Sequence, residues 1–166
     1  MYAFASPPVL DEASRREIAG MLEQVLADEF ALATATRDYH WAVTGPHFRS
    51  LYELFDEQFR QLNEGMEKIA ETARALSVPL RTGWNEMAPR PRFSPVSGYS
   101  LNTRAMMSSL MTMHRGMADC LQAGARERAS ALHPLLAVVL DELLEYHETT
   151  AWMLSELLQD RELAQA

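Results

Sequence analysis

The dipeptide Gly45-Pro46 separates two long stretches in which apolar residues recur at helical spacing. Glycine and proline together mark a turn, and proline also fits the first turn of a helix that follows. We therefore expect one helix from about Asp11 to Val43, with Asp11 or Ser14 as its cap, and a second from about Pro46 to Leu76. The first half of the chain is thus predicted to be a helical hairpin.

Two more amphipathic stretches follow in the second half of the chain. The third helix is expected from Asn102 or Thr103 to about Ala123, with Gly124 as a stop, and the fourth from about Ser130 to Gln159. Residues 77–100 hold four prolines and two glycines, which predicts a long crossover with one short helical turn near Trp84. Two short connections and one long crossover predict an all-α, ferritin-like four-helix bundle, with the crossover between helices two and three and residues 1–166 as one domain.

The composition narrows the classes of function. No apolar run is long enough to span a membrane, the N-terminus does not resemble a secretory signal, and Cys120 is the only cysteine, so we expect a cytoplasmic protein. The net charge is -8, Lys68 is the only lysine, and neither end carries a basic cluster. Because sequence-independent DNA binding depends on clustered Lys and Arg, DNA binding is predicted to be weak. The one local basic surplus is Arg81, Arg90 and Arg92 in the crossover.

A narrow stripe of polar residues runs along the second helix beside its apolar face. Tyr52, Asp56, Glu67 and Glu71 lie on it, roughly a third of a turn from the apolar centre at about 100° per residue. Two interpretations stay open: a solvated helix face, which is the commoner case, or part of a metal site that faces another subunit. His40 at the end of the first helix would supply an imidazole, and imidazole with carboxylates suits Fe(II).

A metal site inside one bundle has less support. Such ferritin sites use Glu-x-x-His pairs that point inward, and His147 instead follows Leu144 by three residues. Glu29 does fall on the apolar side of the first helix, but no histidine partner is visible at that spacing. His47, His133 and His147 are interpreted as structural or surface residues, and Trp41 by default as a core residue.

The string "YHWAVTGPHFRSLYELFDEQF", with "IAETARAL" and "HETTAWML", resembles the Dps family of mini-ferritins. The resemblance covers all four helices. It implies a hollow dodecamer that oxidises Fe(II) with hydrogen peroxide or oxygen and stores the ferric mineral inside. It also implies that each oxidation centre lies between two subunits at a two-fold axis, in agreement with a polar stripe beside the core.

Carried over position by position, the resemblance implies four metal ligands here. His40 and Asp56 would come from one subunit and Glu67 and Glu71 from its partner, with His40, Glu67 and Glu71 as the catalytic set. A second family histidine falls on Tyr52, which is neutral at pH 7 and a poor Fe(II) ligand. The resemblance therefore implies that a first iron position is kept and that a second, weaker one loses its imidazole. Tyr52 and Trp41 would then lie beside the metal without binding it.

The resemblance implies an iron-oxidising, iron-storing cage that protects against oxidative stress. Tyr52 leaves room for an alternative, a nucleoid-associated cage that protects DNA with weak or lost oxidase activity. A third interpretation is a shell that holds another metal, such as zinc, at His40.

Overall fold

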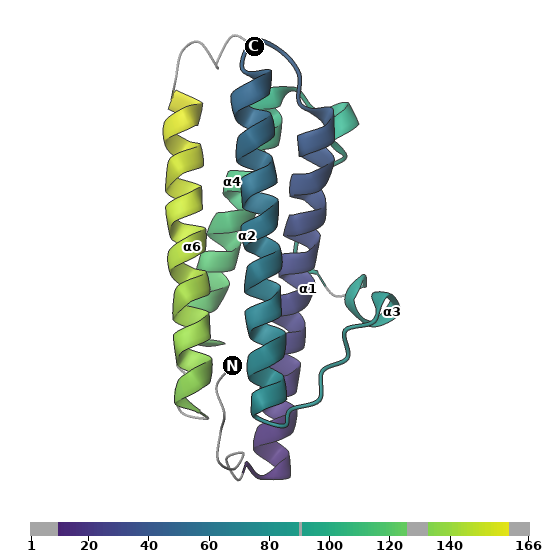
Figure 1. Ribbon diagram of the computed structural model, residues 1–166, viewed down its shortest axis with the longest axis vertical. Coiled ribbons are helices and arrows are strands. Elements are labelled where there is room, and N and C mark those ends of the chain that lie inside the picture. The colour runs from purple at the N-terminus through teal and green to yellow at the C-terminus, as the bar shows by residue number, and fades with distance from the viewer. Residues whose placement is uncertain (1–9, 90, 126–132, 160–166) are drawn as a thin grey trace.

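The computed structural model describes residues 10–89, 91–125 and 133–159, and four long helices form a bundle (Figure 1). The long helices are α1 (Glu12–Ala42), α2 (Phe48–Ala75), α4 (Thr103–Cys120) and α6 (Pro134–Gln159). The shorter elements are α3 (Trp84–Met87), the 3-10 turn η1 (Gly98–Ser100) and the π-helical turn η2 (Leu121–Ala125). α1 packs mainly against α2 and α4 mainly against α6, so the predicted first hairpin and the four-helix bundle are confirmed.

The first hairpin begins and turns where the sequence indicates. The Asp11 side chain accepts a hydrogen bond of 2.7 Å from the backbone N–H of Ser14, which caps α1. Gly45 has a φ of 98°, a conformation that glycine adopts without steric cost. The chain therefore reverses at this residue, and α2 begins three residues later at Phe48. The short helical turn expected near Trp84 is also present, as α3.

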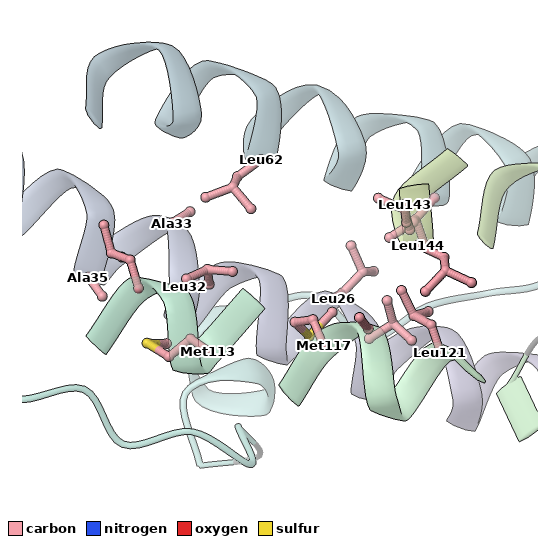
Figure 2. Close-up of a cluster of buried hydrophobic side chains, with 14 of the residues drawn as sticks. Leu26, Leu32, Ala33, Ala35, Leu62, Met113, Met117, Leu121, Leu143 and Leu144 are labelled. Atoms are coloured by element: carbon pink, nitrogen blue, oxygen red, sulfur yellow. The ribbon is translucent and has the colours of Figure 1, made fainter. Parts of the chain in front are cut away.

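Apolar side chains from all four long helices meet in one core. Figure 2 shows Leu26 and Leu32 of α1, Leu62 of α2, Met117 of α4 and the α6 leucines 143 and 144 in this interior. Gly65 allows α2 to approach α6 closely, because a Cβ added there would lie 2.9 Å from Cδ2 of Leu143. The methionines of α4 that are buried act as core residues, as flexible side chains do in irregular interiors.

The long crossover is held against α1 by two buried carboxylates. Glu23 accepts hydrogen bonds from the backbone N–H of Arg81 at 2.8 Å and from its guanidinium at 3.0 and 3.2 Å. Asp28 accepts from the backbone N–H of Arg92 at 2.7 Å and from its Nε at 2.6 Å. Glu23 is 3% exposed and Asp28 is fully buried, so each charge depends on its arginine for compensation.

The end of the crossover is held by two adjacent residues of α1, Asp38 and Tyr39, about three turns beyond Asp28. The Asp38 side chain accepts a 2.6 Å hydrogen bond from the backbone N–H of Gly98, and the Tyr39 hydroxyl donates to the carbonyl of Val96 at 2.9 Å. The crossover thus follows the length of α1 and delivers the chain to Asn102, whose side chain caps α4 by accepting from the N–H of Ala105. Within the described ranges, no helix is long and apolar enough to cross a membrane.

We predict that Asp28→Ala destabilises the fold by about 3 kcal/mol, because it strands the arginine and backbone donors that the carboxylate satisfies. The measurement is the urea unfolding midpoint at one fixed protein concentration. Glu12→Ala is the matched control, since Glu12 forms an exposed pair with Arg16 at 3.1 Å and such pairs contribute little. Equal losses in the two variants would contradict a structural role for the buried carboxylate.

Candidate metal centre

His40 lies near the end of α1, and one of its ring nitrogens is hydrogen-bonded to the backbone of α2. Its Nδ1 lies 2.9 Å from the backbone carbonyl oxygen of Tyr52. Because a carbonyl only accepts, Nδ1 must carry the proton and donate, which leaves the Nε2 lone pair available to a metal. The imidazole is 4% exposed and lies on the Tyr52 ring with centroids 3.7 Å apart. The histidine is thus oriented before any metal arrives.

Asp56 lies one turn beyond Tyr52 on α2 and is engaged by two arginines. Arg37 Nη1 contacts one carboxylate oxygen at 3.0 Å, and Arg60 Nε contacts the other at 3.4 Å. Partial burial by itself would raise the pKa of the Asp56 carboxyl, but hydrogen bonds and charge from Arg37 and Arg60 outweigh it and lower that pKa. Asp56 is therefore ionised and neutralised within the chain.

Glu67 and Glu71 lie on the same face of α2, one turn apart, and both are exposed. In the part of the chain that the structure describes, neither has a hydrogen-bond or ion-pair partner. Glu67 follows Asp56 by eleven residues, about 16 Å along a helix. The predicted ligands therefore form two separate half-sites on one chain, and among the described residues no three His, Cys, Asp or Glu side chains are grouped to hold a metal.

The two half-sites are spaced symmetrically along α2. The midpoint between Tyr52 and Glu71 and the midpoint between Asp56 and Glu67 both fall between Gln61 and Leu62. If a second copy of α2 packed antiparallel about that point, each His40 end would face the two glutamates of the other copy. The exposure of the stripe confirms that these residues face away from the core of their own bundle.

The default expectation for Trp41 is wrong for the single chain. Its side chain is 72% exposed, beside Phe48 at 46% and Tyr52 at 39%. Successive side chains of a helix point about 100° apart. Because the His40 side chain points inward, the side chain of Trp41 points outward. These three aromatic side chains lie next to the His40 half-site.

A buried polar chain in the bundle interior was missed by sequence reasoning. His147 Nε2 lies 2.7 Å from Glu29 Oε1, and His147 Nδ1 lies 2.9 Å from His114 Nδ1. All three side chains are fully buried. Glu29 on the apolar face of α1 was the available signal, but its partner His147 is on α6 and the next member, His114, is on α4, and no local spacing relates them.

The protons in this chain can be assigned from its geometry. A carboxylate accepts, so His147 donates from Nε2, and the two facing Nδ1 atoms share one proton. Burial, assisted by the neighbouring His147, lowers the pKa of His114 well below 6.5. His114 is therefore neutral in the folded protein, and the contacts run in line from Glu29 to His114 rather than converging on one point.

The arginines of the crossover have a structural role in this fold. Arg81 and Arg92 are bound to Glu23 and Asp28, as described above, and Arg90 lies outside the described residues. The local basic surplus identified in the sequence is therefore largely neutralised by carboxylates of α1.

Comparison with known proteins places this arrangement in a family. Residues 19–164 match the ferritin-like domain family. A low temperature-induced protein of Nostoc sp. is 29% identical over 154 residues, which cover 90% of this chain and 84% of that protein. DNA protection during starvation protein 2 of Bacillus anthracis is 24% identical over 148 residues, covering 86% of this chain and 97% of that protein.

Solved structures agree on the fold. The Dps protein of Vibrio cholerae superposes with a TM-score of 0.84 at 21% identity, covering 96% of this chain and all of that one. The Dps of Thermosynechococcus elongatus gives a TM-score of 0.82 at 21% identity, with coverages of 89% and 94%. The chain therefore belongs to the ferritin-like family. Within that family, its fold is similar to that of the solved Dps proteins.

The buried histidines predict how stability depends on pH. In the unfolded chain His114 binds a proton below about pH 6.5, whereas the folded protein keeps it neutral. The free energy of unfolding should therefore decrease as the pH falls below that value, by up to about 1.4 kcal/mol per pH unit. His114→Gln keeps a donor for His147 but removes this titration. Urea midpoints between pH 7.5 and 5.5 should fall less in that variant than in the parent.

His47→Gln serves as the control for this experiment, because His47 lies at the start of α2, away from the buried chain. Its urea midpoints should follow the parent over the same pH range. A His114→Gln variant that still follows the parent would show that another group causes the acid sensitivity.

Proposed function

We propose that this protein assembles as a cage that oxidises Fe(II) at sites between paired subunits and stores the ferric product inside. Iron is the substrate. The observation that supports this proposal most strongly is that the candidate ligands form two half-sites. These half-sites lie at equal distances on either side of the midpoint of α2 between Gln61 and Leu62. His40 of one subunit and Glu67 and Glu71 of the partner subunit would hold one Fe(II), with Glu67 adapting its rotamer to the extra methylene.

The chemistry of these residues suits the proposal. The neutral His40 nitrogen and two carboxylates give a mixed N and O ligand set for Fe(II), and the two negative charges favour Fe(III) as the electron leaves. Each Fe(II) gives one electron, and hydrogen peroxide takes two electrons and two protons to become water. Each peroxide therefore consumes two Fe(II) ions, and a centre that holds one ion would supply the first electron and a second Fe(II), bound there in its turn, the other. The ferric ions leave the centre to form mineral, which would protect a cytoplasm from hydroxyl radicals.

A DNA-protecting cage with weak oxidase activity is the second candidate. The name of the Bacillus anthracis relative and the loss of an imidazole at Tyr52 favour it. The net charge of -8 and the pairing of Arg81 and Arg92 with buried carboxylates reduce the surface available to phosphates. We therefore place iron oxidation first.

We predict that the protein is a dodecamer in solution at micromolar concentration. The unpartnered half-sites and the exposed aromatic residues beside His40 require a partner subunit, and the Dps-like fold suggests twelve. Native mass spectrometry measures the number directly. A stable monomer would contradict both the cage and the shared metal centre.

We predict that Glu71→Ala slows Fe(II) oxidation by hydrogen peroxide at least about tenfold, because it removes a ligand. Tyr52→His should raise the rate by supplying the imidazole that a second iron needs. The assay follows the absorbance of the ferric product. Glu17→Ala, an exposed carboxylate on α1, should match the parent. An unchanged rate in Glu71→Ala would exclude the interface as the site of oxidation.

A further inference from the structure

Arg37 lies beside the candidate centre, although no motif in the sequence assigns it a role there. It lies one helical turn before His40 on α1, so both side chains project from the same face toward α2. Its Nη1 contacts Asp56 at 3.0 Å, and its side chain is 24% exposed. A cation is therefore fixed next to a carboxylate that would otherwise be available to a metal.

Aromatic packing fixes this guanidinium in place. The Arg37 Cζ lies 3.8 Å from the centre of the Phe59 ring and 5.9 Å from that of Trp41. A guanidinium over an aromatic face is attracted by the ring and retains its hydrogen bonds at the edge. Arg37 is thus held by α1 and α2 together, which distinguishes it from a mobile surface arginine.

Asp56 has no oxygen left unpaired in this arrangement. Arg37 binds Oδ1, and Arg60 lies 3.4 Å from Oδ2. A divalent ion that used Asp56 would be repelled by the guanidinium of Arg37 bound to the same carboxylate, while Tyr52 offers no imidazole in return. The residues present at this second position therefore do not fit a metal ion.

We propose that Arg37 replaces the second metal ion of the interface centre as a built-in cation, so that each centre binds a single metal ion. Asp56 then acts as the partner of Arg37 instead of a metal ligand. This inference rests on the proposed function only in using the same interface. Arg37 would thus lie beside the single bound ion and determine the number of metal ions that each centre holds.

The test counts the Zn²⁺ ions bound per subunit by isothermal titration calorimetry of the intact assembly, at one pH and salt concentration. The parent should bind one tight Zn²⁺ per subunit. Arg37→Gln should bind a second Zn²⁺, because removal of the cation releases Asp56. Arg37→Lys keeps the positive charge and should stay at one.

A double variant separates the loss of charge from the gain of a ligand. Arg37→Gln with Asp56→Asn replaces the ion pair by two neutral amides, so the net charge beside the metal equals that of the parent. It should return to one Zn²⁺ with an affinity within about threefold of the parent, a small difference on the scale of tenfold per 1.4 kcal/mol. Arg60→Gln is the matched control, because Arg60 also contacts Asp56 but is 60% exposed, and it should bind one.

The possible outcomes are distinguishable. Two tight Zn²⁺ ions in the parent, or one in Arg37→Gln with its assembly intact by native mass spectrometry, would overturn the role of Arg37. Loss of the tight ion in the double variant would show that Asp56 is a ligand and would also overturn it. If tight binding in the parent is unaffected by Glu71→Ala, the interface is not the metal site, and the proposed function fails with the inference.

Discussion

Buried negative charge on α1 is the constraint on which the rest of this structure depends. Glu23, Asp28 and Glu29 are almost entirely removed from solvent, and a carboxylate in that position must be paired. Their partners come from the crossover and from α6, which are far away in the sequence. Each of the three carboxylates gains a partner when the crossover runs along α1 and α6 completes the bundle. Charge pairing thus adds specificity to a core that apolar contacts alone would fill.

The helices and the exposed stripe could be predicted because they depend on local rules. The cap at Asp11, the reversal at Gly45 and the outward direction of Glu67 and Glu71 follow from short-range geometry, and the structure confirms them. The pairing of Arg92 with Asp28 and of His147 with Glu29 spans 64 and 118 residues, and periodicity carries no information at that range. Trp41 was misjudged for a related reason: an aromatic residue was assigned to the core, whereas in the single chain it is exposed.

The candidate centre was only partly accessible to sequence reasoning. Spacing placed Asp56, Glu67 and Glu71 on one polar stripe, and the resemblance to the Dps family added His40 and assigned all four as ligands. The structure shows that each lies on an outward or helix-pairing face. Spacing could not reveal that Asp56 is already neutralised, since Arg37 reaches it from the other helix of the hairpin. The assembly of His40 with Glu67 and Glu71 into one site remains a prediction, because the two half-sites lie about 16 Å apart along α2 and require a second copy.

The contact between His40 and position 52 explains how an imidazole could be lost there without disordering the remaining ligand. His40 donates its Nδ1 proton to the backbone carbonyl of Tyr52, an acceptor that any residue at this position would supply. The Tyr52 ring packs on the face of the His40 imidazole, with ring centroids 3.7 Å apart. It therefore adds packing at a position where a histidine would have added a metal ligand. Substitution at position 52 therefore changes the second metal position and leaves the orientation of His40 intact. Arg37 supplies positive charge beside Asp56. The orientation of His40 in the hairpin therefore does not depend on the binding of a second metal ion.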